Sequence, residues 1–339
     1  MNILYLGPTS RATTSGHRAH ALQRLGHTVA GVNITSSFNF NRLESKIHYI
    51  TGYRFIQGCV FDALNTSLEE LSFACDLIWI DGGQYFGAQV LAWLKKAFRA
   101  PIVLYNVDDP TGPRDACSFH TLKRSFCHYS LCVFVRQESS LEALALGAKR
   151  VVTVSRSFDE VEHLEASLDT CVNDEVHSLS FLGTNISGEK RDVFLVNLLR
   201  DGVPLRIFGG LYDRSRFWDE IKPFHQKPAI NSDYVSLIQA SIACLGLLSH
   251  QNRDLITTRS LEIPACSGIF CAECSSEHQL LYENQVEAVF WSHPREIPRL
   301  FRRLENPELR SSIKAAARAR ILELGFGNED ICRYILSLL

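Results

Sequence analysis

Short apolar runs alternate with amphipathic segments along the first half of this chain. The apolar runs are bounded by polar or glycine-containing turns and predict strands over residues 2–6, 28–33, 77–80, 102–106, 131–134 and 150–154. Segments whose apolar positions lie three and four residues apart predict helices over residues 17–25, 89–97 and 139–146. Short apolar strands between helices are typical of a parallel sheet that is covered on both faces.

The same alternation restarts after an acidic stretch of weak periodicity, residues 159–177, which we interpret as a linker. Strands are predicted over residues 179–183, 205–209, 242–247, 269–272 and 288–291. Helices are predicted over residues 190–199, 234–240, 258–266, 294–304, 307–324 and 328–339. The pattern therefore predicts two doubly wound α/β domains, residues 1–158 and 178–325, followed by a last helix over 326–339.

The composition narrows the classes of function. A net charge of −2 gives no excess of positive charge for binding nucleic acid. No apolar run reaches the roughly 18 residues of a membrane span, and the first apolar run lacks the basic stretch of a secretory signal, so we expect a cytoplasmic protein. Arginines of the last helices are interrupted by Glu296, Glu305 and Glu308, which favours a solvated face and at most peripheral membrane contact.

The cysteines do not indicate a metal site. The chain has 11, most of them inside apolar runs, which is typical of small buried side chains in a reducing compartment. Cys271 and Cys274 form one CxxC with Cys266 nearby, but no second pair or histidine follows at the spacing of a zinc finger. We therefore expect no metal ligands.

The segment 253–273 concentrates charged groups in front of an apolar run. Asp254 and Glu262 stand eight positions apart, and Glu262 falls in the first turn of a helix that Ser260 opens. Arg253 and Arg259 carry guanidinium groups that suit a phosphate. Such a segment could bind sugar hydroxyls and a diphosphate, although an ordinary capped helix before a buried strand has the same spacing.

Loops after the predicted strands of the first half hold further candidates, because ligands of α/β sheets bind at the carboxyl ends of strands. The loop 7–16 matches neither the dinucleotide GxGxxG pattern nor the P-loop. His17 follows it and is either a general base or a solvated residue in the first turn of a helix. Asp81, Asp108 and Asp109 follow two strands; they could bind sugar hydroxyls or accept a proton, while Asp109 before a proline could equally form a turn.

Glycines follow the first two predicted strands of the second half. Gly183 and Thr184 come after one strand, and Gly209 ends the next. A glycine lets the backbone approach a ligand with no side chain between them, although turn geometry alone also accounts for glycine.

Four passages of the chain resemble the group 1 glycosyltransferases of the GT-B fold, and within them the CgeB-like, spore-maturation-type branch. They occur in the expected order, at residues 136–152, at 181–210 including Arg191, at 258–268 and at 283–291. Residues 258–268 read TRSLEIPACSG and resemble the signature R-x-F-E-x-x-A-C-G-G of that branch. The chain departs from this signature at Leu261 and Ser267.

The resemblance implies two Rossmann-like domains that face each other across a cleft, with the C-terminal helix crossing back to the first domain. It implies that the second domain binds a nucleotide-sugar donor and the first domain the acceptor, with no obligatory metal or other cofactor. Glu262 matches the acid that holds the ribose hydroxyls, Arg259 matches a partner of the diphosphate, and Asp254 falls where many members place the first glutamate of an E-x7-E pair.

The sequence therefore favours a glycosyltransferase that transfers a sugar from a UDP-, GDP- or dTDP-linked donor to a glycan, protein or lipid-linked acceptor. The expected setting is polysaccharide or glycoconjugate biosynthesis. The acid pair favours retention of the anomeric configuration. Two alternatives stay open: a nucleotide-sugar epimerase on the same fold, and a catalytically silent GT-B binding or scaffold protein, which the aspartate at position 254 would suit.

Overall fold

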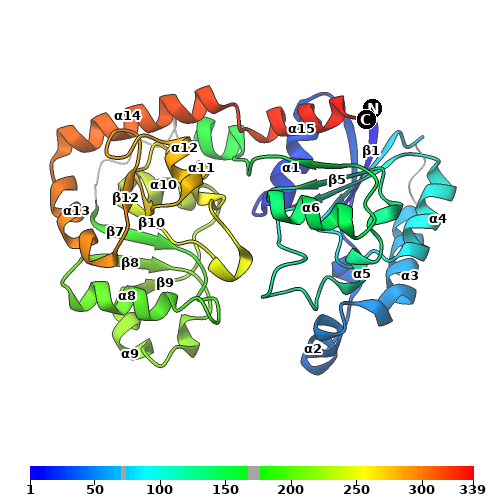
Figure 1. The fold of residues 1–339 in the computed structure, drawn as a ribbon, viewed down its shortest axis with the longest axis horizontal. Coiled ribbons are helices and arrows are strands. Elements are labelled where there is room, and N and C mark those ends of the chain that lie inside the picture. The colour runs from blue at the N-terminus through cyan, green and yellow to red at the C-terminus, as the bar shows by residue number, and fades with distance from the viewer. Residues whose placement is uncertain (70–73, 167–175) are drawn as a thin grey trace. The chain divides into compact units, whose positions relative to one another are not determined.

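The computed structural model describes residues 1–69, 74–166 and 176–339. The chain divides into two compact units (Figure 1). One unit contains Met1–Ser155 together with Asn328–Leu339, and the other contains Arg156–Gly327. We call them unit 1 and unit 2. Each unit has its own sheet and its own hydrophobic core.

Unit 1 is built on a six-stranded parallel sheet with the strand order β2-β1-β3-β4-β5-β6. Its strands are β1 (Asn2–Leu6), β2 (Thr28–Val32), β3 (Leu77–Asp81), β4 (Ile102–Asn106), β5 (Leu131–Phe134) and β6 (Val151–Thr153). The chain moves from β1 outward to β2 and then returns to the other side of β1 for β3. This reversal of strand order is the place where doubly wound sheets open a crevice for ligands.

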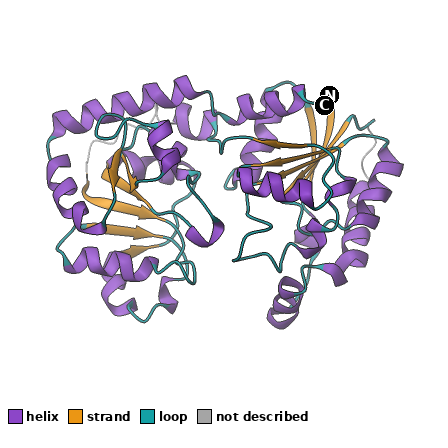
Figure 2. Cartoon of the chain, viewed as in Figure 1, coloured by secondary structure: helices purple, strands orange, loops and turns teal. Residues whose placement is uncertain are grey.

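Helices cover both faces of this sheet (Figure 2). The helices of unit 1 are α1 (Thr14–Arg24), α2 (Arg42–Ile50), α3 (Gln57–Leu68), α4 (Ala88–Phe98), α5 (His120–Lys123), α6 (Gln137–Ala145) and α15 (Asn328–Ser337). Helix α2 has no buried residue and does not cover the sheet. Successive strand residues point to opposite faces, so Leu4 and Ile78 join one apolar cluster while Tyr5 and Trp79 stack on the other face. Both faces of the sheet are therefore buried.

Helix α15 brings the C-terminus into unit 1. It packs against α1, and the Arg24 Nε lies 2.6 Å from the Glu329 Oε1. The Arg150 Nη2 also donates to the carbonyl oxygen of Leu338 at 2.7 Å. The last helix thus completes the first unit although it follows the second in sequence.

Unit 2 contains a second six-stranded parallel sheet, with the order β12-β11-β10-β7-β8-β9. Its strands are β7 (Val176–Leu182), β8 (Leu205–Phe208), β9 (His225–Gln226), β10 (Ser241–Gly246), β11 (Phe270–Glu273) and β12 (Val289–Trp291). The strand order reverses between β7 and β10, so the loops after these two strands meet at one edge of the sheet.

The helices of unit 2 lie on both faces of its sheet (Figure 2). They are α8 (Arg191–Arg200), α9 (Trp218–Ile221), α10 (Asn231–Ala240), α11 (Arg259–Ala265), α12 (Ser276–Leu281), α13 (Ile297–Leu304) and α14 (Pro307–Leu324), with a π-helix over Glu160–Glu165. Separate apolar clusters fill the two faces, one around Leu245 and one around Phe270. The Arg318 Nη1 of α14 donates to the Ala265 carbonyl at 2.8 Å and so fixes the end of α11.

The predicted fold class is confirmed: both halves are parallel α/β sheets with flanking helices. The sequence prediction missed helices α2 and α3, the short helices α5, α9 and α12, and the short strand β9. Part of the predicted linker, 159–177, falls on residues 167–175, outside the described residues, and Glu160–Glu165 of it form the π-helix. Within the described residues, no helix is both long and apolar enough to cross a membrane.

Candidate functional site

A pocket of about 90 Å³ opens at the carboxyl ends of β7 and β8 in unit 2. Gly183 and Thr184 follow β7, and Gly209 follows β8. Tyr234 of α10 and Arg259 of α11 complete the polar part of the lining. Three of the predicted donor-binding residues therefore share one pocket with the arginine that the signature resemblance singled out.

Backbone packing explains the glycine at position 209. A Cβ added there would lie 2.0 Å from the Gly183 carbonyl oxygen, which is far inside van der Waals contact. The two strand ends are held together because the Gly183 amide donates to the Phe208 carbonyl at 2.8 Å. At Gly183 and Gly209 the pocket is consequently lined by backbone without a side chain, which lets a ligand approach closely.

Glu262 of α11 lies beside this pocket with two side chains directed at its carboxylate. The Tyr234 hydroxyl donates to the Glu262 Oε2 at 2.8 Å, and the His163 Nε2 lies 3.8 Å from Oε1. Burial, followed by the negative charge of Glu262, raises the pKa of Tyr234 well above its usual value. The phenol therefore stays protonated and donates to the carboxylate of Glu262, a residue that is 8% exposed.

The position of His163 comes from the π-helix that contains it. Its Nδ1 accepts a hydrogen bond from the Asp159 backbone amide at 2.9 Å. A neutral ring with this bond carries its proton on Nε2, on the side of Glu262. The Asp159 side chain caps the same helix by accepting from the amides of Val161 and Glu162 at 3.0 Å.

Arg259 places a cationic donor in the pocket. It begins α11, and its Nε is buried without a hydrogen-bond partner among the described residues. Buried donors normally have partners, and an unpartnered guanidinium N–H facing a pocket suits an anion. Phosphate oxygens have both the charge and the geometry for such a donor.

Arg191, at the start of α8, braces the loop after β7. Its Nη1 donates to the Thr184 carbonyl at 3.0 Å, and its Nη2 donates to the Ser249 Oγ at 2.8 Å. It joins the loops that follow β7 and β10. The sequence placed Arg191 in a family-like passage but gave it no role in the site, because both partners lie in loops that spacing cannot pair.

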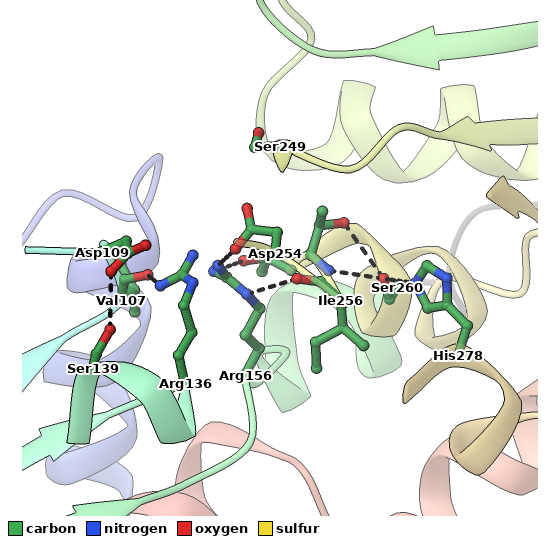
Figure 3. A network of polar contacts seen from close by, with 12 residues as sticks. Val107, Asp109, Arg136, Ser139, Arg156, Ser249, Asp254, Ile256, Ser260 and His278 are labelled. Carbon is green, nitrogen blue, oxygen red and sulfur yellow. Dashed lines mark hydrogen bonds and ion pairs between the residues drawn. The ribbon is translucent and has the colours of Figure 1, made fainter. Parts of the chain in front are cut away.

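Asp254 forms an ion pair that the sequence did not reveal. The Arg156 Nη2 donates to the Asp254 Oδ1 at 2.9 Å, while the Arg156 Nε donates to the Ile256 carbonyl at 3.2 Å (Figure 3). Arg253 precedes it with φ at 52°, in the left-handed region. Asp254 and Arg253 both lie outside the lining of the described pocket. Arg156 thus holds the loop before α11 in its present conformation.

Ser260 takes part in a buried chain of hydrogen bonds. The His278 Nδ1 donates to the Glu273 carbonyl at 2.7 Å, so its Nε2 is the acceptor for the Ser260 hydroxyl at 2.9 Å (Figure 3). Ser260 Oγ in turn accepts from the Thr257 amide at 3.0 Å. Burial lowers the pKa of His278, which keeps the ring neutral. Ser260 is fully buried and ties the start of α11 to the end of β11.

Asp81, at the end of β3, is engaged in a buried ion pair within unit 1. The Arg18 Nε and Nη2 donate to its two carboxylate oxygens at 2.7 and 2.9 Å, and the Tyr5 hydroxyl donates to Oδ2 at 2.8 Å. The Arg18 guanidinium also lies over the Tyr105 ring, 4.4 Å from its centre. These contacts join α1 to the sheet at the point where its strand order reverses.

The remaining candidates of unit 1 are Asp108 and Asp109, in the loop after β4, and His17, near the start of α1. Asp109 is 1% exposed and accepts from the Ser139 hydroxyl at 3.1 Å (Figure 3). Asp108 is half-buried. The His17 Nε2 lies 2.6 Å from the Arg11 carbonyl and donates to it. Asp109 therefore supports the loop that contains it, and His17 of α1 holds the loop that precedes the helix.

Among the described residues, no group of three or more His, Cys, Asp or Glu side chains could hold a metal ion. Cys266 and Cys271 are buried, and burial raises the pKa of Cys271 to about 12, so its thiol is protonated. The prediction of buried cysteines is confirmed for Cys132, Cys244, Cys266, Cys271 and Cys332, whereas Cys59, Cys117 and Cys127 are exposed.

Comparison with known proteins identifies the fold. Residues 191–336 match the family described as glycosyl transferase-like. The architecture is that of the GT-B glycosyltransferases. The matched segment contains Gly209, Tyr234 and Arg259 of the pocket lining, together with Arg191 and Glu262. The family match and the fold together support a glycosyltransferase in general.

Solved GT-B structures match the chain over nearly its whole length. A sucrose-phosphate synthase from Thermosynechococcus elongatus has a TM-score of 0.70 at 11% identity, covering 100% of this chain and 98% of that one. Anabaena Alr3699/HepE in complex with UDP-glucose has a TM-score of 0.64 at 15% identity, covering 100% of both chains. AviGT4, a glycosyltransferase involved in avilamycin A biosynthesis, has a TM-score of 0.61 at 11% identity, covering 99% and 96%. No protein with a curated description matches the chain.

Proposed function

We propose that this protein is a glycosyltransferase whose unit 2 binds a nucleotide-sugar donor. The observation that carries the proposal is the carboxylate of Glu262, which receives a hydrogen bond from Tyr234 and lies next to a glycine-floored pocket lined by Arg259. A carboxylate accepts hydrogen bonds from the two hydroxyls of a ribose, and an unpartnered guanidinium N–H binds a phosphate.

In this proposal the diphosphate leaves with its negative charge stabilised by Arg259, and no metal is required. Gly183, Thr184 and Gly209 let the nucleotide approach the strand ends, while Arg191 keeps the loop after β7 in place. Donors that are already oriented toward a developing charge lower the barrier because they do not have to reorganise during the reaction.

Asp254 is proposed to lie near the donor sugar, with its charge held by Arg156. Unit 1 is proposed to bind the acceptor. There Arg18 holds Asp81 and Ser139 holds Asp109, and the half-buried Asp108 is proposed to face the acceptor. His17, whose Nε2 donates to the Arg11 carbonyl, would act as a base through its Nδ1.

The finer assignments are part of the same proposal. Residues 258–268 support a place in the CgeB-like branch, and the acid pair supports a retaining reaction. UDP-glucose is the first donor to test, because HepE binds it on a similar fold, with GDP- and dTDP-sugars as alternatives. We propose a cytoplasmic role in polysaccharide or glycoconjugate biosynthesis, with a glycan, protein or lipid-linked acceptor.

Calorimetric titration with UDP-, GDP- and dTDP-sugars tests the donor site. At least one donor should bind, and Glu262→Gln should weaken its binding at least tenfold, because hydrogen bonds to charged groups contribute roughly 1.5–3 kcal/mol. Glu220→Gln is the matched control, since that residue forms an exposed ion pair with Arg200. Absence of binding by every donor would contradict the proposal.

A binding protein without turnover is the second candidate. The ion pair between Asp254 and Arg156 favours it, because a shorter acid already paired with an arginine is less available to a substrate. Proton NMR of donors incubated with the protein separates the possibilities, because an epimer has the same mass as its donor but a different spectrum. Transfer or slow hydrolysis supports the glycosyltransferase, conversion of the donor to its epimer without acceptor indicates an epimerase, and an unchanged donor after binding indicates the silent protein.

A further inference from the structure

Helix α2 of unit 1 presents large apolar side chains to solvent. Leu43 is 67% exposed, Ile47 42% and Ile50 55%, and Phe55 just beyond the helix is 65% exposed. Every residue of α2 is exposed except His48, which is half-buried. A surface helix of a globular protein normally buries its apolar stripe, so this helix has the opposite arrangement.

The exposed side chains form one continuous stripe. Leu43, Ile47 and Ile50 are spaced by four and three residues, so they lie on the same side of the helix. Phe55 lies in the short 3₁₀ helix Arg54–Ile56, beyond the turn at Gly52 and Tyr53, and is exposed as well. We call these four residues the α2 stripe.

The helix is well formed without a partner on the α2 stripe. Asn41 and Glu44 form a complete capping box at its start. At its other end the Tyr49 hydroxyl donates to Asp115, and the His48 ring packs 4.5 Å from the Phe40 ring. These contacts hold α2 by its polar side, so the stripe contributes little to the fold and is available for binding.

Basic residues flank the α2 stripe. Arg42, Lys46 and Arg54 are all exposed. Lys46 lies three positions after Leu43 and one before Ile47, and the Arg54 guanidinium lies over the Phe55 ring, 4.6 Å from its centre. Glu44, the acidic residue of the helix, bonds back to the Asn41 amide in the capping box. The apolar surface is thus bordered by positive charge.

We propose that α2 lies on an anionic lipid surface, with the α2 stripe inserted among the acyl chains and Arg42, Lys46 and Arg54 at the headgroups. An apolar stripe combined with basic residues is the pair of signals that holds a helix at a membrane interface. A second copy of the chain is the poorer occupant, because it would bring like charges together around the same stripe. The inference does not rest on the proposed transferase activity.

Co-sedimentation with lipid vesicles tests the proposal on the full chain. We expect binding to vesicles of phosphatidylglycerol and phosphatidylcholine in equal parts, and little binding to phosphatidylcholine alone. Ile47→Glu with Ile50→Glu should abolish binding, and Arg42→Gln with Lys46→Gln should reduce it roughly thirtyfold, given about 1 kcal/mol for each of the two basic residues near the surface. Added salt should weaken it as well.

The matched control is Leu280→Glu, because that leucine is 79% exposed on α12 of unit 2. It should bind vesicles as the wild type does, and circular dichroism should show all variants folded. The proposal is overturned if no vesicle binds, if both lipid compositions bind equally, or if the stripe variants bind unchanged. Light scattering that shows dimers lost in the Ile47/Ile50 variant, without vesicle binding, would assign the stripe to a second copy instead.

Discussion

At the scale of single residues, the chemistry of Glu262 depends on side chains that no sequence spacing connects. Tyr234 and His163 lie in different elements from Glu262, and only the fold directs them at its carboxylate. The sequence could identify Glu262 itself, because a carboxylate in the first turn after an arginine resembles a known signature. Arg156 could not be found in this way, since its partner Asp254 lies in a distant loop.

His278 gives unit 2 a pH dependence whose sign follows from its burial. Burial lowers the pKa of His278 in the folded chain, while in the unfolded chain it is about 6.5. At higher pH the His278 imidazole is neutral in both the folded and the unfolded chain. As the pH falls below about 6.5, the unfolded chain takes up this proton before the folded chain does, so the free energy of unfolding decreases.

Urea unfolding at pH 7 and pH 5 measures this effect. The wild type should lose stability between the two values, and His278→Gln should remove the contribution of this ring to that loss. His177→Gln is the control, because its side chain is 60% exposed, and this variant should lose stability as the wild type does. If His278→Gln has the same pH dependence of stability as the wild type, burial of His278 beside Ser260 does not disfavour the protonated imidazole, and this explanation is wrong.

At the scale of elements, burial decided which segments the sequence could predict. Strands such as β3 and β4 are buried on both faces, so their runs are almost wholly apolar and easy to recognise. Helix α2 has its apolar residues at helical spacing, so the sequence could have predicted the helix, but the exposure of those residues depends on the fold. Strand β9 is only two residues long and lies at an edge of the sheet.

The ends of β7 and β8 make a sharp prediction at this scale. Gly209→Ala should lower the free energy of unfolding by about 1–3 kcal/mol, because its Cβ would lie 2.0 Å from the Gly183 carbonyl oxygen and the strand ends would have to separate. Gly210→Ala is the matched control, since a Cβ there has no heavy atom within 4 Å in the described structure. Equal urea midpoints for the two variants would show that the packing of Gly209 against the Gly183 carbonyl does not require a glycine.

At the scale of the whole molecule, the restart of the strand and helix pattern predicted a second α/β unit, and the structure divides the chain into two such units. The division follows contacts and not sequence order, because α15 packs on α1 in unit 1 after the chain has completed unit 2. Local periodicity could predict that last helix, whereas its destination depends on surfaces far apart in the sequence.

A structure of the protein bound to UDP or UDP-glucose would show directly whether Glu262 and the pocket beside it bind the donor. We expect the ribose hydroxyls to lie within hydrogen-bond distance of the Glu262 carboxylate while Tyr234 still donates to it. We also expect a phosphate oxygen at the Arg259 Nε and the nucleotide against the backbone of Gly183 and Gly209. A nucleotide bound elsewhere, or one whose ribose does not contact Glu262, would contradict the proposal.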